Sequence, residues 1–143
     1  MVSLPHVEQT PDGRRFVVDR VVDAGPETVW TVLTDTERWP EWGPSVSAVR
    51  SADRYIHDGA TGEVQVAGGP WLPFEIDTCA DYRWTWRVAK LPATGHAVTP
   101  LGEEQARVAF ELPLLAGGYA IVCDRALDRI EALLEHNSEE SQT

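Results

Sequence analysis

Four histidines occur in this sequence, and His96 is the one best placed to do chemistry. It lies near the start of a predicted strand, Gly95–Pro100, where its ring can face an interior cavity. Imidazole changes its protonation state near neutral pH, so His96 is the candidate general acid or base of a catalytic site. The alternative interpretation is a histidine held by hydrogen bonds at the end of a strand.

Tryptophan is the second candidate for function, because six tryptophans are many for a chain of 143 residues. Trp84 and Trp86 alternate in phase with Tyr82 and Val88, so all four side chains are predicted to face the interior. Indole rings there can line a pocket for a flat ligand or simply fill a core. The residues expected to contact a ligand are Trp42, Trp71, Phe74, Trp84, Trp86, His96, Phe110 and Tyr119.

Four aromatic residues have predicted roles that depend on loops and helix ends. Trp42 and Trp71 are expected in loops that frame an entrance, and loop aromatics are better functional candidates than core ones. Trp39 is expected to hold its loop against the first helix. Tyr119 lies near the start of the last predicted helix, where its hydroxyl could orient the polar end of a ligand or reach solvent.

The charged side chains of the predicted strands fall out of phase with the apolar ones. Their alternation places them on the outer, wet face of the sheet, where they are expected to form cross-strand ion pairs. A bulge of one residue would reverse this pattern beyond it. The pattern therefore favours binding over acid–base catalysis. The outward-facing set comprises Glu75, Asp77, Arg83, Arg87, Arg107 and Glu111.

Metal and cofactor sites are not expected. Cys79 and Cys123 form no CxxC pair, the histidines are scattered, and no glycine-rich phosphate loop or GxSxG motif occurs. A net charge of −11 disfavours binding to nucleic acids and anionic membranes. Without a long apolar run or a signal-peptide pattern, the chain is expected to be cytoplasmic, without membrane insertion, and a monomer or homodimer.

The first part of the chain predicts one strand and two helices. A β-branched run at Arg14–Val22 predicts a strand. Pro26 and Glu27 suit the first turn of a helix that ends near Thr34. A short helix at Asp35–Arg38 then leads into an ordered loop at residues 39–44, whose two prolines and glycine oppose a helix.

Period-two alternation follows, and it gives way to a helical period from Ala116 onward. The apolar stripe from Tyr119 to Leu134 must be buried, and the dry face of the sheet is the only apolar surface available. The sequence therefore predicts an α+β domain with an antiparallel sheet of about seven strands. Its later strands are predicted at Val46–Ser51, Gly62–Ala67, Phe74–Ala80, Tyr82–Val88, Gly95–Pro100 and Gln105–Leu112.

Several short motifs, taken in order, resemble those of the START-like or SRPBCC superfamily and of its polyketide cyclase/dehydrase-type bacterial proteins. The resemblance implies a helix-grip (Bet v 1-like) fold over residues 14–136. The polar segments on either side predict a loose lead-in at 1–13 and a frayed tail at 137–143. The resemblance also implies a cavity between the sheet and the long C-terminal helix. The motifs are Val21–Trp30, Trp39–Trp42, Tyr82–Arg87, Gly95-His96 and Leu127–Leu134.

Three functions remain open at this point. The preferred hypothesis is binding, transport or sequestration of a small, mostly hydrophobic molecule such as a lipid or polyketide. An aromatase/cyclase-like enzyme using the same cavity is the alternative, with His96 as its acid–base residue. A protein-interaction module is the third possibility, and an exposed apolar patch formed by Trp39 and Trp42 would favour it.

Overall fold

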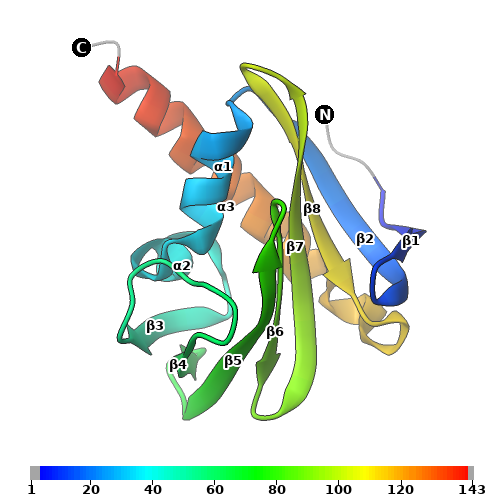
Figure 1. Cartoon of the computed structure of the whole chain (residues 1–143), viewed down its shortest axis with the longest axis vertical. Helices are drawn as coiled ribbons and strands as arrows, with labels where there is room; N and C mark the ends of the chain where they lie inside the picture. Colours follow the sequence, from blue (N-terminus) through cyan, green and yellow to red (C-terminus); the bar gives the residue numbers. More distant parts are fainter. Residues whose placement is uncertain (1–3, 142–143) are drawn as a thin grey trace.

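An eight-stranded antiparallel sheet forms the body of the molecule (Figure 1). The structure is a computed structural model that describes residues 4–141, and the side chains of residues 4–136. The strands are β1 His6–Thr10, β2 Gly13–Val22, β3 Val46–Ser51, β4 Thr61–Val66, β5 Trp71–Ala80, β6 Arg83–Val88, β7 Leu91–Gly102 and β8 Gln105–Leu112. Their order across the sheet is β1-β2-β8-β7-β6-β5-β4-β3.

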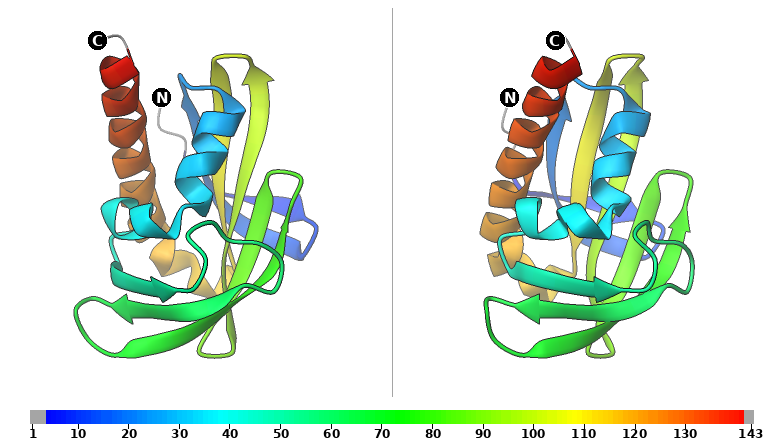
Figure 2. Two further views of the ribbon diagram at one scale, coloured as in Figure 1. Left: turned by 60° about the vertical axis from the view of Figure 1, so that its left-hand side comes forward. Right: turned by 90° about the vertical axis from the view of Figure 1, so that its left-hand side faces the viewer.

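Helices occupy one side of this sheet. They are α1 Pro26–Thr34, the 3-10 turn η1 Thr36–Arg38, α2 Trp39–Trp42, the 3-10 turn η2 Leu114–Tyr119 and α3 Ala120–Ser141. Figure 2 shows α3 beside α1, with β3, β4 and β5 running nearly across the direction of β7 and β8. The sheet therefore bends around the helices, which is the predicted helix-grip arrangement.

The core lies between α3 and the inner face of the sheet. Val108, Phe110 and Leu112 of β8 are buried on that face, as the alternation of the sequence predicted. Leu127 and Ile130 of α3 are buried against it. None of the helices in the described part of the chain is long and apolar enough to span a membrane.

The ends of the chain differ from the predicted organisation. The expected loose lead-in contains β1, which pairs with β2 and raises the strand number from about seven to eight. Helix α3 begins at Ala120 instead of Ala116, because residues 114–119 form η2. It continues to Ser141, so most of the expected tail is helical, and residues 142–143 lie outside the described residues.

The predicted loop at residues 39–44 contains a short helix. Pro40 falls in the first turn of α2, where the missing N–H of proline costs no hydrogen bond. The helix ends at Trp42, and the N–H of Gly43 donates to the carbonyl of Trp39. Trp42 therefore lies on a helix and not in a loop.

A bulge in β5 reverses the predicted faces of its last residues. The register between β5 and β6 shifts between Ile76 and Thr78. Thr78 consequently lies on the outer face, where its hydroxyl is 2.9 Å from that of Thr85, and Cys79 packs against the core. Alternation continued from Phe74 and Ile76 predicts an inward Thr78 and an outward Cys79. This prediction is wrong, because one unpaired residue moves the side chains after it to the opposite face.

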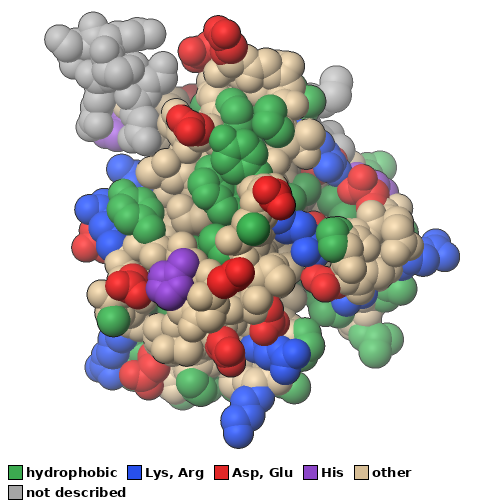
Figure 3. Space-filling view, in the orientation of Figure 1, with side chains coloured by type: hydrophobic (Ala, Val, Ile, Leu, Met, Phe, Trp, Pro, Cys, Tyr) green, Lys and Arg blue, Asp and Glu red, His purple; other side chains and the backbone are tan. Residues whose placement is uncertain are grey.

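The outer face carries two of the predicted ion pairs, whereas Arg107 pairs with Asp19 and Glu8 instead of a carboxylate of the predicted set. Arg87 contacts Asp77 at 3.2 Å, and Arg83 binds both carboxylate oxygens of Glu111 at 3.1 and 2.7 Å. Glu111 was expected to face water, yet only 7% of its surface is exposed. Gly95 lies opposite Glu111 in the ladder and leaves room for its side chain to cross β7. Acidic and basic side chains are interspersed over the face shown in Figure 3.

Candidate functional site

A small cavity of about 50 Å³ lies between α3 and the inner face of β6, β7 and β8. We call it the deep cavity. Six of the eight predicted ligand-contacting residues line it. These six are Trp42, Trp84, Trp86, His96, Phe110 and Tyr119.

The other two predicted contacts lie outside the deep cavity. Phe74 packs behind its wall, with ring centroids 5.4 Å from Trp39 and 5.8 Å from Trp86. Trp71 is the first residue of β5 and not part of a loop, and the guanidinium of Arg50 lies 3.8 Å from its ring centroid. Neither residue touches the space that the other six enclose.

A second and larger cavity of about 310 Å³ adjoins the first. We call it the vestibule. It lies between β3 and β4 on one side and β7, β8 and η2 on the other, and its walls are mostly apolar. Residues common to the walls of both cavities are Ser45, Val46, Trp86, Thr94 and Tyr119.

A pair of hydroxyl groups marks the junction of the two cavities. Ser45 follows α2, Tyr119 ends η2, and their side-chain oxygens lie 2.6 Å apart. Burial raises the pKa of the Tyr119 phenol above its ordinary value of 10.0, so the group is neutral at physiological pH. We call this pair the neck.

Aromatic rings fill most of the space around the deep cavity. The indoles of Trp39 and Trp84 are stacked, with centroids 5.2 Å apart and planes 7° from parallel. The imidazole of His96 stacks on the other side of Trp84 at 3.7 Å, and Phe110 meets it edge-on at 4.9 Å. The wall is thus a continuous aromatic cluster with a fixed geometry.

Hydrogen bonds define the protonation of His96. Its Nδ1 lies 3.4 Å from the carbonyl oxygen of Trp84, which can only accept, so Nδ1 carries the proton. Nε2 must then accept, and the Thr94 hydroxyl at 2.9 Å donates to it. The Thr94 oxygen in turn accepts from the indole N–H of Trp86 at 3.0 Å.

Burial keeps this imidazole neutral. Only 2% of the His96 surface is exposed, and desolvation lowers its pKa to about 3, with a smaller contribution from the nearby charge of Arg83. Both ring nitrogens are already hydrogen-bonded. These features favour a histidine held by hydrogen bonds over a general acid or base, which works best with a pKa near the operating pH.

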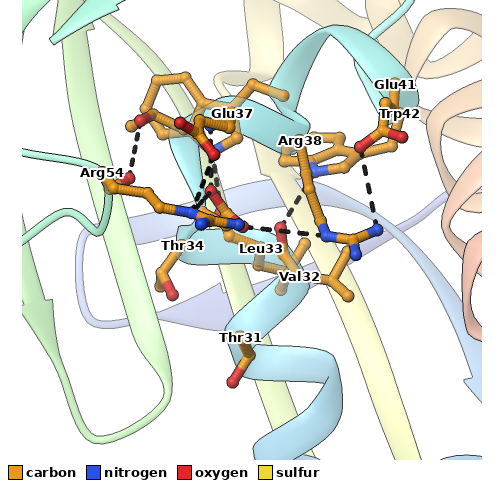
Figure 4. Close-up of polar contacts among 12 residues, drawn as sticks. Thr31, Val32, Leu33, Thr34, Glu37, Arg38, Glu41, Trp42 and Arg54 are labelled. Carbon is orange, nitrogen blue, oxygen red and sulfur yellow. Dashed lines mark hydrogen bonds and ion pairs between the residues drawn. The ribbon is translucent and has the colours of Figure 1, made fainter. Parts of the chain in front are cut away.

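The two tryptophans of α2 are fixed to α1 by their indole nitrogens. Trp39 donates to the carbonyl of Leu33 at 2.9 Å, and Trp42 donates to that of Val32 at 3.2 Å (Figure 4). The predicted anchoring of this segment by Trp39 is confirmed. These two bonds use carbonyls that α1 leaves free at its C-terminal end. They therefore satisfy the end of the helix and position the cavity wall at the same time.

A buried carboxylate holds the turn that precedes α2. Asp35 is 1% exposed, and its two oxygens accept from Nε and Nη2 of Arg54 at 3.0 and 2.9 Å (Figure 4). The same carboxylate accepts from the backbone N–H of Glu37 at 3.1 Å and so caps η1. The position of the α2 tryptophans therefore depends on an ion pair located outside the cavity.

One inward-facing charge was missed from the sequence. Arg20 of β2 is 2% exposed and contacts three carboxylates of α3: Asp124 at 3.0 Å, Asp128 at 2.7 Å and Glu131 at 3.2 Å. Arg20 alternates in phase with the buried Val18, which is the signal that predicts its inner position. It lines neither cavity, and it ties α3 to the sheet.

Comparison with known proteins agrees with this geometry. Residues 13–135 match the sequence profile of the family described as polyketide cyclase / dehydrase and lipid transport. The chain belongs to this family. No curated protein matches it.

Solved structures place this polyketide cyclase/dehydrase family member among START-like folds. A START superfamily protein from Mycobacterium smegmatis superposes with a TM-score of 0.62 and 17% identity, over 85% of this chain and 97% of that one. A protein from Arthrobacter aurescens gives a TM-score of 0.64 and 14% identity, over 92% and 91% of the two chains. Another M. smegmatis protein gives 0.63 and 16%, over 96% and 99%.

Proposed function

We propose that this family member binds a small, mostly hydrophobic molecule in the deep cavity and the vestibule. The observation that carries the proposal is the pair of adjoining cavities between the sheet and α3, whose described walls hold no Asp, Glu, Lys or Arg side chain. Concave, mostly apolar sites with a few polar groups are typical of small-molecule binding. The description of the family, which includes lipid transport, is consistent with this function.

The alternative of a cyclase-like enzyme has less support. A general acid or base would be needed at the reacting atoms, and the described cavity walls offer no carboxylate. Cys123 lines the deep cavity, but burial raises the pKa of its thiol to about 12, which leaves it a poor nucleophile. His96 is neutral, with both nitrogens engaged.

The protein-interaction alternative loses the feature that motivated it. Trp39 is 2% exposed and Trp42 is 5% exposed, so the two rings form no surface patch. Both belong to the wall of the deep cavity instead. A binding function uses these residues, whereas a surface-docking function does not.

Binding is tested by native mass spectrometry and tryptophan fluorescence against panels of lipids, sterols and polyphenols. Val122 lines the deep cavity from α3, so Val122→Phe should fill it and weaken binding of any captured ligand at least tenfold. The matched control is Ile121→Phe on the neighbouring residue, which is 66% exposed and should have no effect. Absence of binding across the panels, or equal loss in both variants, would contradict the proposal.

A further inference from the structure

The polar groups in the walls of the two cavities are all uncharged, and most of them already have a partner. Thr94, His96 and the indole N–H of Trp86 bond to one another and to the backbone of Trp84. The indole N–H groups of Trp39 and Trp42 bond to α1. These groups have no free donor to offer a ligand. The indole N–H of Trp84, a residue of the deep-cavity wall, is buried and has no hydrogen-bond partner in the structure.

The neck also offers a free donor, and there it borders both cavities, because a pair of hydroxyls uses only one of its two protons. One of Ser45 and Tyr119 donates to the other across 2.6 Å, and the accepting hydroxyl keeps its own proton. That proton, together with the remaining lone pairs, can bond to a carbonyl or hydroxyl oxygen. The neck also touches both cavities, so a ligand that spans them places part of itself beside this pair.

A carboxylate or phosphate at the same place would find no opposite charge. The described walls carry no guanidinium or ammonium group, and the inward-facing Arg20 is already shared by three carboxylates. Tyr119 is 38% exposed, so an ionised group can keep part of its water at the neck. The apolar walls beyond it offer no opposite charge, so a ligand drawn into the cavities binds more weakly in its ionised form than in its neutral form. The net charge of −11 opposes anions further.

We infer that the site selects uncharged ligands, and that Ser45 and Tyr119 at the neck receive the ligand's carbonyl or hydroxyl group. This inference rests on the proposed binding function and adds the charge class of the ligand. It separates neutral molecules such as alcohols, ketones and phenols from free fatty acids and phospholipids. Tyr119 and Ser45 are then the residues that determine specificity.

Three probes with one ring system test the charge selection. Isothermal titration calorimetry of the full chain compares 2-naphthaleneethanol, 2-naphthaleneacetic acid and 2-ethylnaphthalene at pH 5.5 and 7.5. At pH 7.5 the alcohol should bind at least 100-fold more tightly than the acid. Between pH 7.5 and 5.5 the affinity for the acid should rise about tenfold per pH unit, whereas that for the alcohol stays constant.

The outcomes separate this inference from the function on which it rests. If the acid binds as tightly as the alcohol at pH 7.5, charge selection is overturned while hydrophobic binding stands. If none of the three probes binds while a member of the lipid, sterol or polyphenol panels does, the inference is overturned and the proposed function stands; if no panel member binds either, both are overturned. If the alcohol and the hydrocarbon bind, and the affinity for the acid rises with its neutral fraction, the proposed function and the charge selection are both supported.

A second set of variants tests the neck itself. Tyr119→Phe and Ser45→Ala should each weaken binding of the alcohol about fivefold, which is the effect of one hydrogen bond. Binding of 2-ethylnaphthalene should not change. Tyr55→Phe is the control, because Tyr55 is 47% exposed and lines neither cavity. Equal loss for both probes, or no loss for the alcohol, would overturn the role of the neck.

Discussion

The imidazole of His96 lies nearly parallel to the indole of Trp84, with 3.7 Å between the ring centroids and 16° between the planes. This contact leaves no room for water on that face of the imidazole. It explains why a histidine, the residue best suited to proton transfer, is uncharged here. The consequence for stability can be measured.

Folding should become less favourable in acid because of His96. Its pKa falls from 6.5 to about 3 on folding, so below pH 6.5 the unfolded chain binds a proton that the folded chain does not. The stability that depends on neutral His96 is complete above pH 6.5 and is lost as the pH falls toward 3. When the pH falls from 7 to 5, the free energy of unfolding should decrease in both chains. The decrease should be about 2 kcal/mol smaller in His96→Gln than in the parent chain, as measured by urea denaturation.

His57 provides the control for this measurement. It is exposed, and its hydrogen bond to Asp53 raises its pKa, so His57→Gln should change the pH dependence in the opposite direction. Identical pH dependence in His96→Gln and the parent would contradict a neutral, buried His96.

The losses of stability caused by neutralising the three carboxylate partners of Arg20 should be strongly non-additive. Asp124→Asn, Asp128→Asn and Glu131→Gln should each cost less than about 1 kcal/mol, because two carboxylates remain and all three are partly exposed. The triple variant leaves a buried guanidinium without an opposite charge and should cost about 3 kcal/mol or more in urea denaturation.

The change of net charge in that experiment needs its own control. Neutralising the exposed Asp81, Glu103 and Glu104 removes the same charge from residues that lie between strands. That variant should unfold at the urea concentration of the parent or above it. If the triple variant of the Arg20 partners loses no more unfolding free energy than the sum of its single changes, the role of Arg20 in holding α3 to β2 is refuted.

Gly95→Ala should destabilise the sheet through Glu111. A Cβ at Gly95 would lie 2.9 Å from Oε1 of Glu111, the carboxylate that holds Arg83. The cost should be about 2 kcal/mol in the parent and at least about 1 kcal/mol smaller in a Glu111→Ala background, since the clashing group is then gone. Gly102→Ala in the same strand, where a Cβ meets nothing within 4 Å, should be close to neutral. Equal costs in the two backgrounds would assign the effect to the backbone.

Cys123 should resist thiol reagents while the protein is folded. It is 2% exposed, and burial raises the pKa of its thiol to about 12, so almost no thiolate forms at pH 8. In a Cys79→Ser chain, reaction with a disulfide reagent at pH 8 should be at least 100-fold slower than in urea. Rapid labelling of the folded protein would show instead that α3 leaves the sheet often enough to expose the cavity.

Periodicity predicted the fold because burial and secondary structure impose the same spacing. In β8 every second residue faces α3, and the sequence shows this directly in Val108, Phe110 and Leu112. The early strand β1 was missed because it has five residues, pairs with only one neighbour and buries none of its side chains fully. Such a strand carries little of the apolar signal on which sequence prediction depends.

The aromatic residues around the deep cavity were predictable, but its shape was not. Phase along β6 and β8 indicated Trp84 and Phe110, whereas the bulge in β5 that turns Cys79 inward has no marker in the sequence. Which rings would stack on one another, and how little space they leave, depends on contacts between distant segments. The Ser45–Tyr119 contact, 74 positions apart in the chain, belongs to that group.

The stacked indoles of Trp39 and Trp84 also have a spectroscopic consequence. Two nearly parallel chromophores at 5.2 Å couple their electronic transitions, so they absorb and emit as a pair. The circular dichroism of such a coupled pair depends on the distance and the angle between the two transition dipoles. Any molecule that separates or tilts the two rings therefore changes this signal. The protein thus carries an intrinsic optical reporter in the wall of the cavity, and occupancy can be followed without a label.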